Sequence, residues 1–139
     1  MKVISLVQAR MGSTRFPGKV LQPILDVTLI EMLLARLSKS KELDDIVVAT
    51  SVDPQNDELQ AIVEGLGHRC TRGSEENVLE RFYESAKLIG ADVLVRITAD
   101  CPLVDPELVD QCVQAYKDTN VDYFSNVDPA SYPDGLDIE

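Results

Sequence analysis

Apolar runs alternate with amphipathic stretches along the chain. The run Val3–Ala9 is almost wholly apolar, as in a strand that is covered on both faces of a parallel sheet. The runs Ile46–Thr50 and Val93–Thr98 have the same character, and a short edge strand is expected near His68–Thr71. A fifth strand is expected at Val121–Ser125. The pattern therefore predicts several strands separated by other elements.

Apolar residues recur at helical spacing between these strands. Gly67 follows the second such stretch and is expected to end its helix, and Asp105 before Pro106 is typical of a helix N-cap followed by proline at the first helical position. The predicted inner faces are Leu29, Ile30, Leu33, Leu34 and Leu37; Leu59, Ile62, Val63 and Leu66; Leu79, Phe82, Tyr83 and Ala86; and Leu108, Val109, Cys112, Val113 and Tyr116.

Alternating strands and helices predict an α/β fold, in which a Rossmann-like parallel or mixed sheet carries helices on both faces. In such folds, ligands bind beyond the carboxyl ends of the strands, where the strand order reverses. Two loops with unusual content leave those ends, Arg10–Lys19 and Ala99–Asp105. If the strands that precede them are neighbours, the two loops face each other.

Composition places the chain among ordinary globular proteins. Its 139 residues, 45% hydrophobic and 27% charged, predict a single domain over residues 1–139. No apolar run suits a signal peptide or a membrane span, and the three cysteines have no paired spacing. We therefore expect a cytoplasmic protein without a membrane partner.

Charge is distributed unevenly. The net charge of −11 argues against a nucleic-acid partner or an anionic membrane. Yet none of the 24 acidic residues precedes Asp26, whereas Lys2, Arg10, Arg15 and Lys19 do. A locally cationic segment in an acidic protein indicates a site for a small, highly charged anion.

This cationic segment is not a P-loop. Gly12, Gly18 and Lys19 supply glycines and a lysine, but one residue too many separates the glycines. Val20 follows the lysine and has no hydroxyl for Mg²⁺. The glycines still permit tight turns and close approach of backbone amides to an anion.

The side chains of the two loops suit a polyphosphate with a metal ion. Arg10 and Arg15 can fork onto phosphate oxygens, Ser13 adds a hydroxyl, and Lys19 adds a mobile charge. Asp100 comes directly after a buried strand, and Mg²⁺ needs only one or two carboxylates when phosphates and waters complete its shell. Asp100 alone could equally be an ordinary turn residue.

Three motifs together resemble a known family. They are Gln8–Leu21 (QARMGSTRFPGKVL), Thr71–Arg81 (TRGSEENVLER) and Arg96–Asp105 (RITADCPLVD). Their order and spacing resemble the cytidylyltransferases that activate sugars as CMP conjugates, such as ketodeoxyoctulosonate and acylneuraminate cytidylyltransferases. The match is closest to the branch that includes the spore coat polysaccharide biosynthesis proteins.

This resemblance implies a nucleotide-diphosphosugar transferase fold and Mg²⁺-dependent transfer of CMP to a sugar, with release of pyrophosphate. CTP and a sugar are the implied partners, and a homodimer is compatible with it. Arg10, Lys19 and Asp100 are the implied catalytic residues, with Asp100 as the Mg²⁺ ligand. The implied nucleotide-binding residues are Ala9, Arg10, Gly12, Ser13, Arg15, Lys19, Arg72 and Asn77.

The sequence also departs from the family. Tyr132–Glu139 looks like a turn leading into a strand, so we expect a domain truncated at its C-terminus, the N-terminal part of a longer one. In the sugar-activating relatives, a second metal-binding Asp and much of the sugar pocket come from later chain.

Two alternatives stay open: the same chemistry with another nucleotide or acceptor, as in the molybdenum-cofactor nucleotidyltransferases, and a non-catalytic nucleotide-binding or interaction module. The acidic residues Glu75, Glu76, Glu80 and Glu84 are expected to form the solvated face of a helix.

Overall fold

A parallel four-stranded sheet forms the centre of the computed structural model, which describes residues 1–139. Its strand order is β5-β4-β1-β6, so the first strand lies inside the sheet and the strand order reverses beside it. The strands are β1 (Val3–Gln8), β4 (Asp45–Ser51), β5 (Arg69–Gly73) and β6 (Val93–Thr98). Gln8, at the end of β1, is level with Ala49 of β4 and Thr98 of β6.

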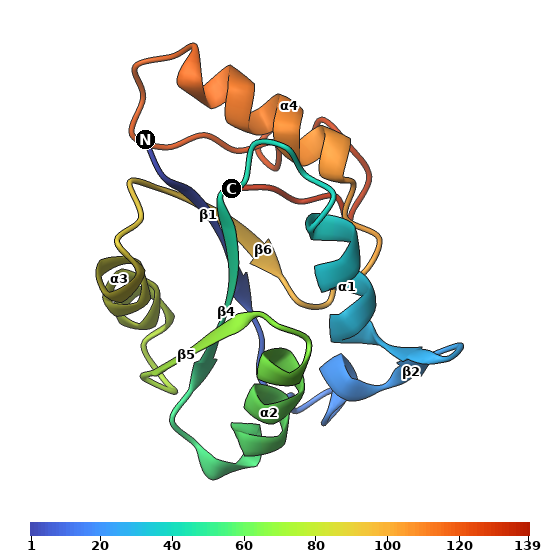
Figure 1. Cartoon of the computed structure of the whole chain (residues 1–139). Coiled ribbons are helices and arrows are strands. Elements are labelled where there is room, and N and C mark those ends of the chain that lie inside the picture. The colour runs from blue at the N-terminus through green and yellow to red at the C-terminus, as the bar shows by residue number, and fades with distance from the viewer.

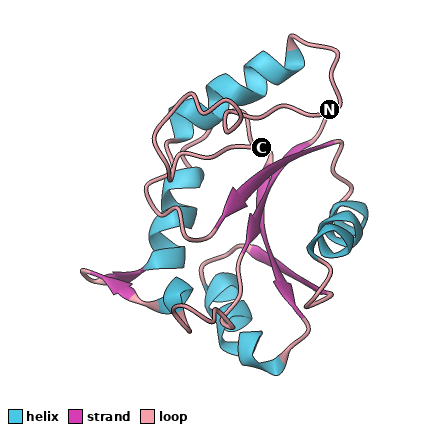
Figure 2. Cartoon of the chain, turned by 180° about the vertical axis from the view of Figure 1, so that it is seen from behind, coloured by secondary structure: helices cyan, strands magenta, loops and turns pink.

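Helices cover both faces of this sheet, as predicted (Figure 1). α3 lies alone on one face, and α1, α2 and α4 lie on the other, which Figure 2 shows from behind. The helices are α1 (Leu29–Leu37), α2 (Asp57–Gly65), α3 (Val78–Ile89) and α4 (Pro106–Lys117). Two short 3₁₀ turns, η1 (Lys19–Leu21) and η2 (Pro54–Asn56), and a hairpin of β2 (Pro23–Ile24) and β3 (Val27–Thr28) complete the elements. None of the helices has the length and apolar character that crossing a membrane requires.

The alternation of side chains along β1 divides the core in two. Val3 and Val7 point to the face of α1, α2 and α4 and belong to the larger apolar cluster. Ile4 and Leu6 point to the other face and pack with Phe82 of α3 in a smaller cluster. Because both faces are covered, β1 is apolar except for Ser5 and Gln8 rather than alternating, which is why its sequence predicts a parallel strand so clearly.

Side-chain caps fix the starts of the helices. The predicted N-cap is confirmed: the Asp105 side chain accepts a hydrogen bond from the Glu107 amide at 2.9 Å, and Pro106 opens α4. Thr28 caps α1 by accepting from the Glu31 amide. Each cap satisfies a donor that the first helical turn leaves free.

Expectations about the inner faces of two helices and about one strand are wrong. Leu66, expected on the inner face of α2, is 38% exposed. Leu79 and Tyr83 were expected on the inner face of α3, but they are 81% and 62% exposed. The helix instead turns Phe82 and Ile89 inward, because a single helix on this face needs only a narrow apolar stripe. Val121–Ser125 forms no strand and runs as an irregular segment after α4.

The last residues lie along the outer edge of β6. Tyr132–Glu139 contains a turn, as predicted, but no strand follows it. The Arg96 amide donates to the Glu139 carbonyl at 2.7 Å, and Ile138 is buried in the larger apolar cluster. Packing of Ile138 therefore holds this segment against the sheet edge.

Candidate functional site

A polar pocket of about 270 Å³ opens at the carboxyl ends of β1 and β6. These two strands are neighbours in the sheet, so the loops that follow them meet, as expected at a reversal of strand order. The pocket is lined by Gln8, Ala9, Arg10, Ser13, Arg15, Lys19, Val20, Arg96, Thr98, Ala99 and Asp100. The cations of the first loop and the carboxylate of the second therefore share one concave space.

The loop after β1 folds around the backbone of Met11. The Met11 carbonyl accepts from the amides of Ser13 and Gly18, both at 2.9 Å. Gly18 has a φ of +69°, which a side chain would strain, and it leads directly into η1. This closed turn brings Ser13, Arg15 and Lys19 to the pocket from one short segment.

A buried asparagine ties that loop to the end of β4. The Asn56 side chain, which is fully buried, accepts from the Met11 amide at 2.8 Å. Its amide nitrogen donates to Ser51 Oγ at 2.7 Å. Asn56 thus links the loop after β1 to the loop after the neighbouring strand. No short motif in the sequence marks this residue, because its partners are far away along the chain.

Lys19 and Asp100 form an ion pair across the pocket, with 3.2 Å between Nζ and Oδ2. Burial raises the pKa of Asp100, but hydrogen bonds from Thr98 and Lys19 outweigh it, so this pKa lies below its ordinary value. The carboxylate is therefore ionised at neutral pH. It remains half exposed and can also reach a ligand from the solvent side.

The other cations of the pocket differ in their partners. Arg10 Nη1 lies 3.4 Å from Glu75 Oε1, in the segment between β5 and α3. Glu75 was expected on the solvated face of a helix. It lies instead before the start of α3 and is partly buried. Arg15 has no ion-pair partner and stands free at the pocket.

Arg96 also lines the pocket, although in the sequence it stands out only as part of the third motif. Its guanidinium donates to Gln8 Oε1 at 3.2 Å and pairs with the Glu139 carboxylate. A lone charge inside the apolar run of β6 is the signal that could have found it. Gln8, Arg96 and Thr98 reach the pocket from the same face of the sheet, since Arg96 and Thr98 alternate with the buried Val95 and Ile97.

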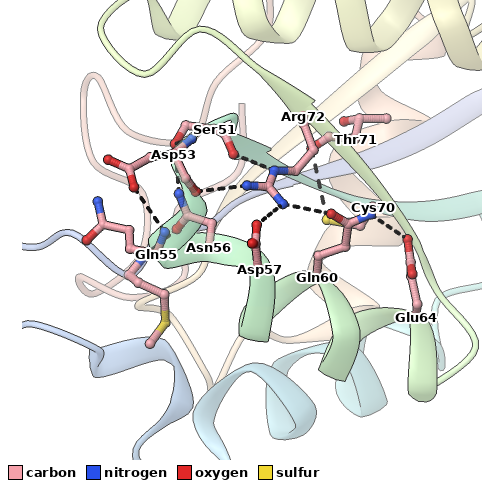
Figure 3. Close-up of polar contacts among 11 residues, drawn as sticks. Ser51, Asp53, Gln55, Asn56, Asp57, Gln60, Glu64, Cys70, Thr71 and Arg72 are labelled. Carbon is pink, nitrogen blue, oxygen red and sulfur yellow. Dashed lines mark hydrogen bonds and ion pairs between the residues drawn. The ribbon is translucent and has the colours of Figure 1, made fainter.

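Arg72 does not line the pocket, although it is one of the expected nucleotide-binding residues. Figure 3 shows its guanidinium reaching from β5 to the start of α2. It donates to the carbonyls of Ser51 at 2.6 Å and Asp53 at 2.8 Å, and to the side chains of Asp57 and Gln60 at 2.8 Å. Four of its five N–H groups are thus used within the chain. A contact between Arg72 and a nucleotide stays a prediction.

Two further expected residues also lie outside the pocket lining. The Asn77 side chain caps α3 by accepting from the Glu80 amide at 3.0 Å. Gly12 lies against the Gln55 side chain, where an added Cβ would come within 2.6 Å of Gln55 Nε2. Their local roles are therefore a helix cap and a close contact between two loops, and a role in nucleotide binding stays a prediction for both.

Asp100 is the carboxylate that lines the pocket. No group of three or more His, Cys, Asp or Glu side chains gathers as a metal site in the molecule. A single half-exposed carboxylate beside cations fits a hard cation that is held mainly by a ligand's phosphates and by water, as Mg²⁺ is. It does not fit an ion such as structural zinc, which requires a full set of protein ligands.

A second hollow, of about 290 Å³, lies between β6, α4 and the C-terminal segment. Its lining is mainly apolar and includes Val93, Val95, Cys112, Tyr116 and Phe124. It contains no cationic side chain. An anionic ligand is therefore expected in the polar pocket and not in this second hollow.

Known proteins resemble this chain over nearly its full length. Spore coat polysaccharide biosynthesis protein SpsF of Bacillus subtilis is 43% identical over 125 residues, which cover 87% of this chain and 52% of that protein. The 8-amino-3,8-dideoxy-manno-octulosonate cytidylyltransferase of Shewanella sp. is 35% identical over 122 residues, 84% of this chain and 48% of that protein. The chain thus spans about half the length of these curated relatives.

A solved structure and a family model agree with these relatives. A cytidylyltransferase from Leptospira borgpetersenii superposes with a TM-score of 0.93 at 36% identity, over 99% of this chain and 59% of that chain. The model of the family described as cytidylyltransferase matches residues 4–130, which include both loops of the pocket. The chain therefore belongs to the cytidylyltransferase family.

Proposed function

We propose that this chain binds CTP and Mg²⁺ in the polar pocket and takes part in the transfer of CMP to a sugar, with release of pyrophosphate. The single observation that carries the proposal is the meeting of Arg10, Arg15, Lys19 and Asp100 in one pocket at the carboxyl ends of β1 and β6. Family membership adds to it, because the relatives include an enzyme named for cytidylyl transfer to an octulosonate.

The cations would hold the triphosphate. A triphosphate carries several negative charges in a short length, and Arg15 and Lys19 project from one closed loop toward the same space as Arg10. Arginine forks onto phosphate oxygens through two N–H groups, whereas lysine supplies a point charge that follows its partner. Together they would neutralise the charge of the phosphates and fix the chain of phosphorus atoms in one orientation.

Asp100 would hold Mg²⁺ together with the phosphate oxygens. Bound Mg²⁺ supplies further neutralisation of phosphate charge and makes pyrophosphate a better leaving group. In the transfer itself, a sugar hydroxyl oxygen would form a bond to the α-phosphorus while the bond from that phosphorus to the pyrophosphate oxygen breaks. The part of this chain is to align the phosphorus and to stabilise the charge that develops.

Calorimetry with CTP, with and without Mg²⁺, tests the proposal. We expect the unmodified chain to bind CTP more tightly with Mg²⁺, and Asp100→Asn to lose this difference while its circular dichroism spectrum stays unchanged. Asp118→Asn, an exposed position at the end of α4, is the matched control. A full Mg²⁺ effect in Asp100→Asn would show that another carboxylate is the ligand, with Asp137 the next residue to replace.

Pyrophosphate release distinguishes catalysis from binding alone. The chain is incubated with CTP, Mg²⁺ and a panel of acidic sugars, and the same reactions are run with UTP and ATP. Release with CTP and one sugar supports the transferase, and release with another nucleotide would move the proposal to a different donor. Binding of CTP without release under every condition would identify a nucleotide-binding module.

A further inference from the structure

A buried arginine of α3 leaves most of its donors unused. Arg81, on α3, is only 1% exposed. Its Nη1 donates to the Ser74 carbonyl at 2.8 Å, but Nε and Nη2 have no partner. A buried guanidinium with unpaired N–H groups costs free energy, so its persistence calls for a compensating negative charge nearby.

Glu75 follows Ser74 in the chain, and its negative charge acts on the Arg81 guanidinium. One of its carboxylate oxygens, Oε2, is also buried and without a hydrogen-bond partner, and the other faces Arg10. Burial lowers the pKa of Arg81, the negative charge of Glu75 raises it, and the positive charge of Arg10 lowers it. The three charges therefore influence one another; the direct ion pair joins Glu75 and Arg10, and Arg81 acts on the carboxylate at longer range.

The backbone fixes this arrangement tightly. Gly73, at the end of β5, lies so close to α3 that an added Cβ would come within 2.9 Å of Arg81 Cγ. The Arg81 stem is thus held against the strand, and its bond to Ser74 anchors the segment that carries Glu75. Arg81 thus fixes the backbone next to Glu75 through Ser74, and the Glu75 carboxylate in turn reaches Arg10 at the pocket.

We infer that Glu75 is a positioning residue, whose backbone segment the buried Arg81 anchors and which keeps the Arg10 guanidinium at the pocket. The inference rests on the proposed function, in which Arg10 contacts the phosphates. Without the Glu75 charge, Arg10 and Arg81 would repel each other, and the half-exposed Arg10 side chain would turn into solvent. Binding of a triphosphate would then have to order Arg10, which weakens affinity.

The first test is a double-mutant cycle on CTP binding. We expect Glu75→Gln to weaken the affinity for CTP with Mg²⁺ about fivefold, and to change nothing further when Arg10→Ala is already present. Glu76→Gln, the exposed neighbour, is the matched control and should bind like the unmodified chain. Tighter binding by Glu75→Gln would identify Glu75 as a competitor of the phosphates and overturn the inference. An equal loss in both backgrounds would overturn it as well, because a purely structural role does not depend on Arg10.

The second test needs no nucleotide. In the free protein, the NMR order parameter of Arg10 Nε–H should fall in Glu75→Gln and in Arg81→Met, and stay unchanged in Glu76→Gln. An unchanged order parameter in folded Glu75→Gln would overturn the inference. If the unmodified chain fails to bind CTP, the proposed function fails, yet this measurement still decides whether Glu75 positions Arg10.

Discussion

Lys19 and Asp100 lie 81 positions apart in the sequence, yet their side chains form an ion pair of 3.2 Å across the pocket. The pair exists because β1 and β6 are adjacent and parallel, so that both loops leave the sheet at the same edge. In the proposed complex, the pair would separate: Asp100 would turn to Mg²⁺ and Lys19 to phosphate. The free protein thus keeps both charges compensated until a ligand of the right charge replaces the pair.

Lys19→Met should weaken CTP binding about ten- to hundredfold, which is the range for one charge-assisted contact. The fold should persist, because Asp100 is half exposed and water can solvate the unpaired carboxylate. Calorimetry at moderate salt measures the affinity. Lys39→Met, an exposed lysine after α1, is the control and should leave the affinity unchanged. Equal affinities for the two variants would remove Lys19 from the site.

Asn56→Ala should lower the free energy of unfolding by about 1–3 kcal/mol, because the Met11 amide and the Ser51 hydroxyl lose their partner in a buried place. Urea denaturation measures this loss. Hydrogen exchange should also become faster at the Met11 amide. Asn120→Ala, at an exposed position, is the control and should change neither the free energy of unfolding nor the exchange rate of the Met11 amide. Normal protection of Met11 in Asn56→Ala would mean that the loop holds its shape without this tie.

Arg72→Lys should also lower the free energy of unfolding by about 1–3 kcal/mol, because an ammonium group cannot reproduce the four bonds of the guanidinium. The affinity for CTP decides whether Arg72 also contacts the nucleotide: without such a contact, Arg72→Lys binds CTP within about twofold of the unmodified chain. Arg69→Lys, on the same strand, is the control, because its guanidinium makes one half-exposed ion pair with Asp45. A large loss of CTP affinity in Arg72→Lys alone would confirm the contact with the nucleotide that the motif predicts.

Cys70 should react slowly with iodoacetamide at pH 8. Burial, and then the negative charge of Glu64, raise the pKa of its thiol to about 11. The rate of labelling, measured by mass spectrometry, should rise with pH until the pH reaches this pKa. A plateau near the pKa of a free thiol, about 8.5, would contradict the assignment.

The raised pKa of Cys70 also affects the stability of the fold at alkaline pH. Because the folded-state pKa lies above the unfolded one, Cys70 contributes stability that is complete below about pH 8.5 and is lost as the pH rises toward 11. The difference in unfolding free energy between the unmodified chain and Cys70→Ser should therefore shrink over this range. A constant difference would show that the thiol titrates alike in both states.

Local patterns in the sequence determined much of this protein. The apolar run of β1, the helical spacing of α1 and the Asp105–Pro106 start of α4 all act within one element, through side-chain periodicity and backbone geometry. The alternation of these elements determined the layered α/β architecture. The cationic loop and Asp100 then indicated a phosphate pocket, because a parallel sheet brings the carboxyl ends of its strands together.

The tertiary structure alone decided which charges meet. The local sequence predicts that Glu75 is a solvated acid. In the structure it pairs with Arg10, 65 positions away, and the buried Arg81 anchors the neighbouring Ser74. Arg72 belongs to a motif that predicts contact with a nucleotide, yet the end of β4 and the start of α2 take up most of its donors. Such pairings depend on distances between elements, and the sequence of each element carries no information on its distance from the others. The physical reason is that charge interactions act through space, whereas periodicity and capping act along the chain.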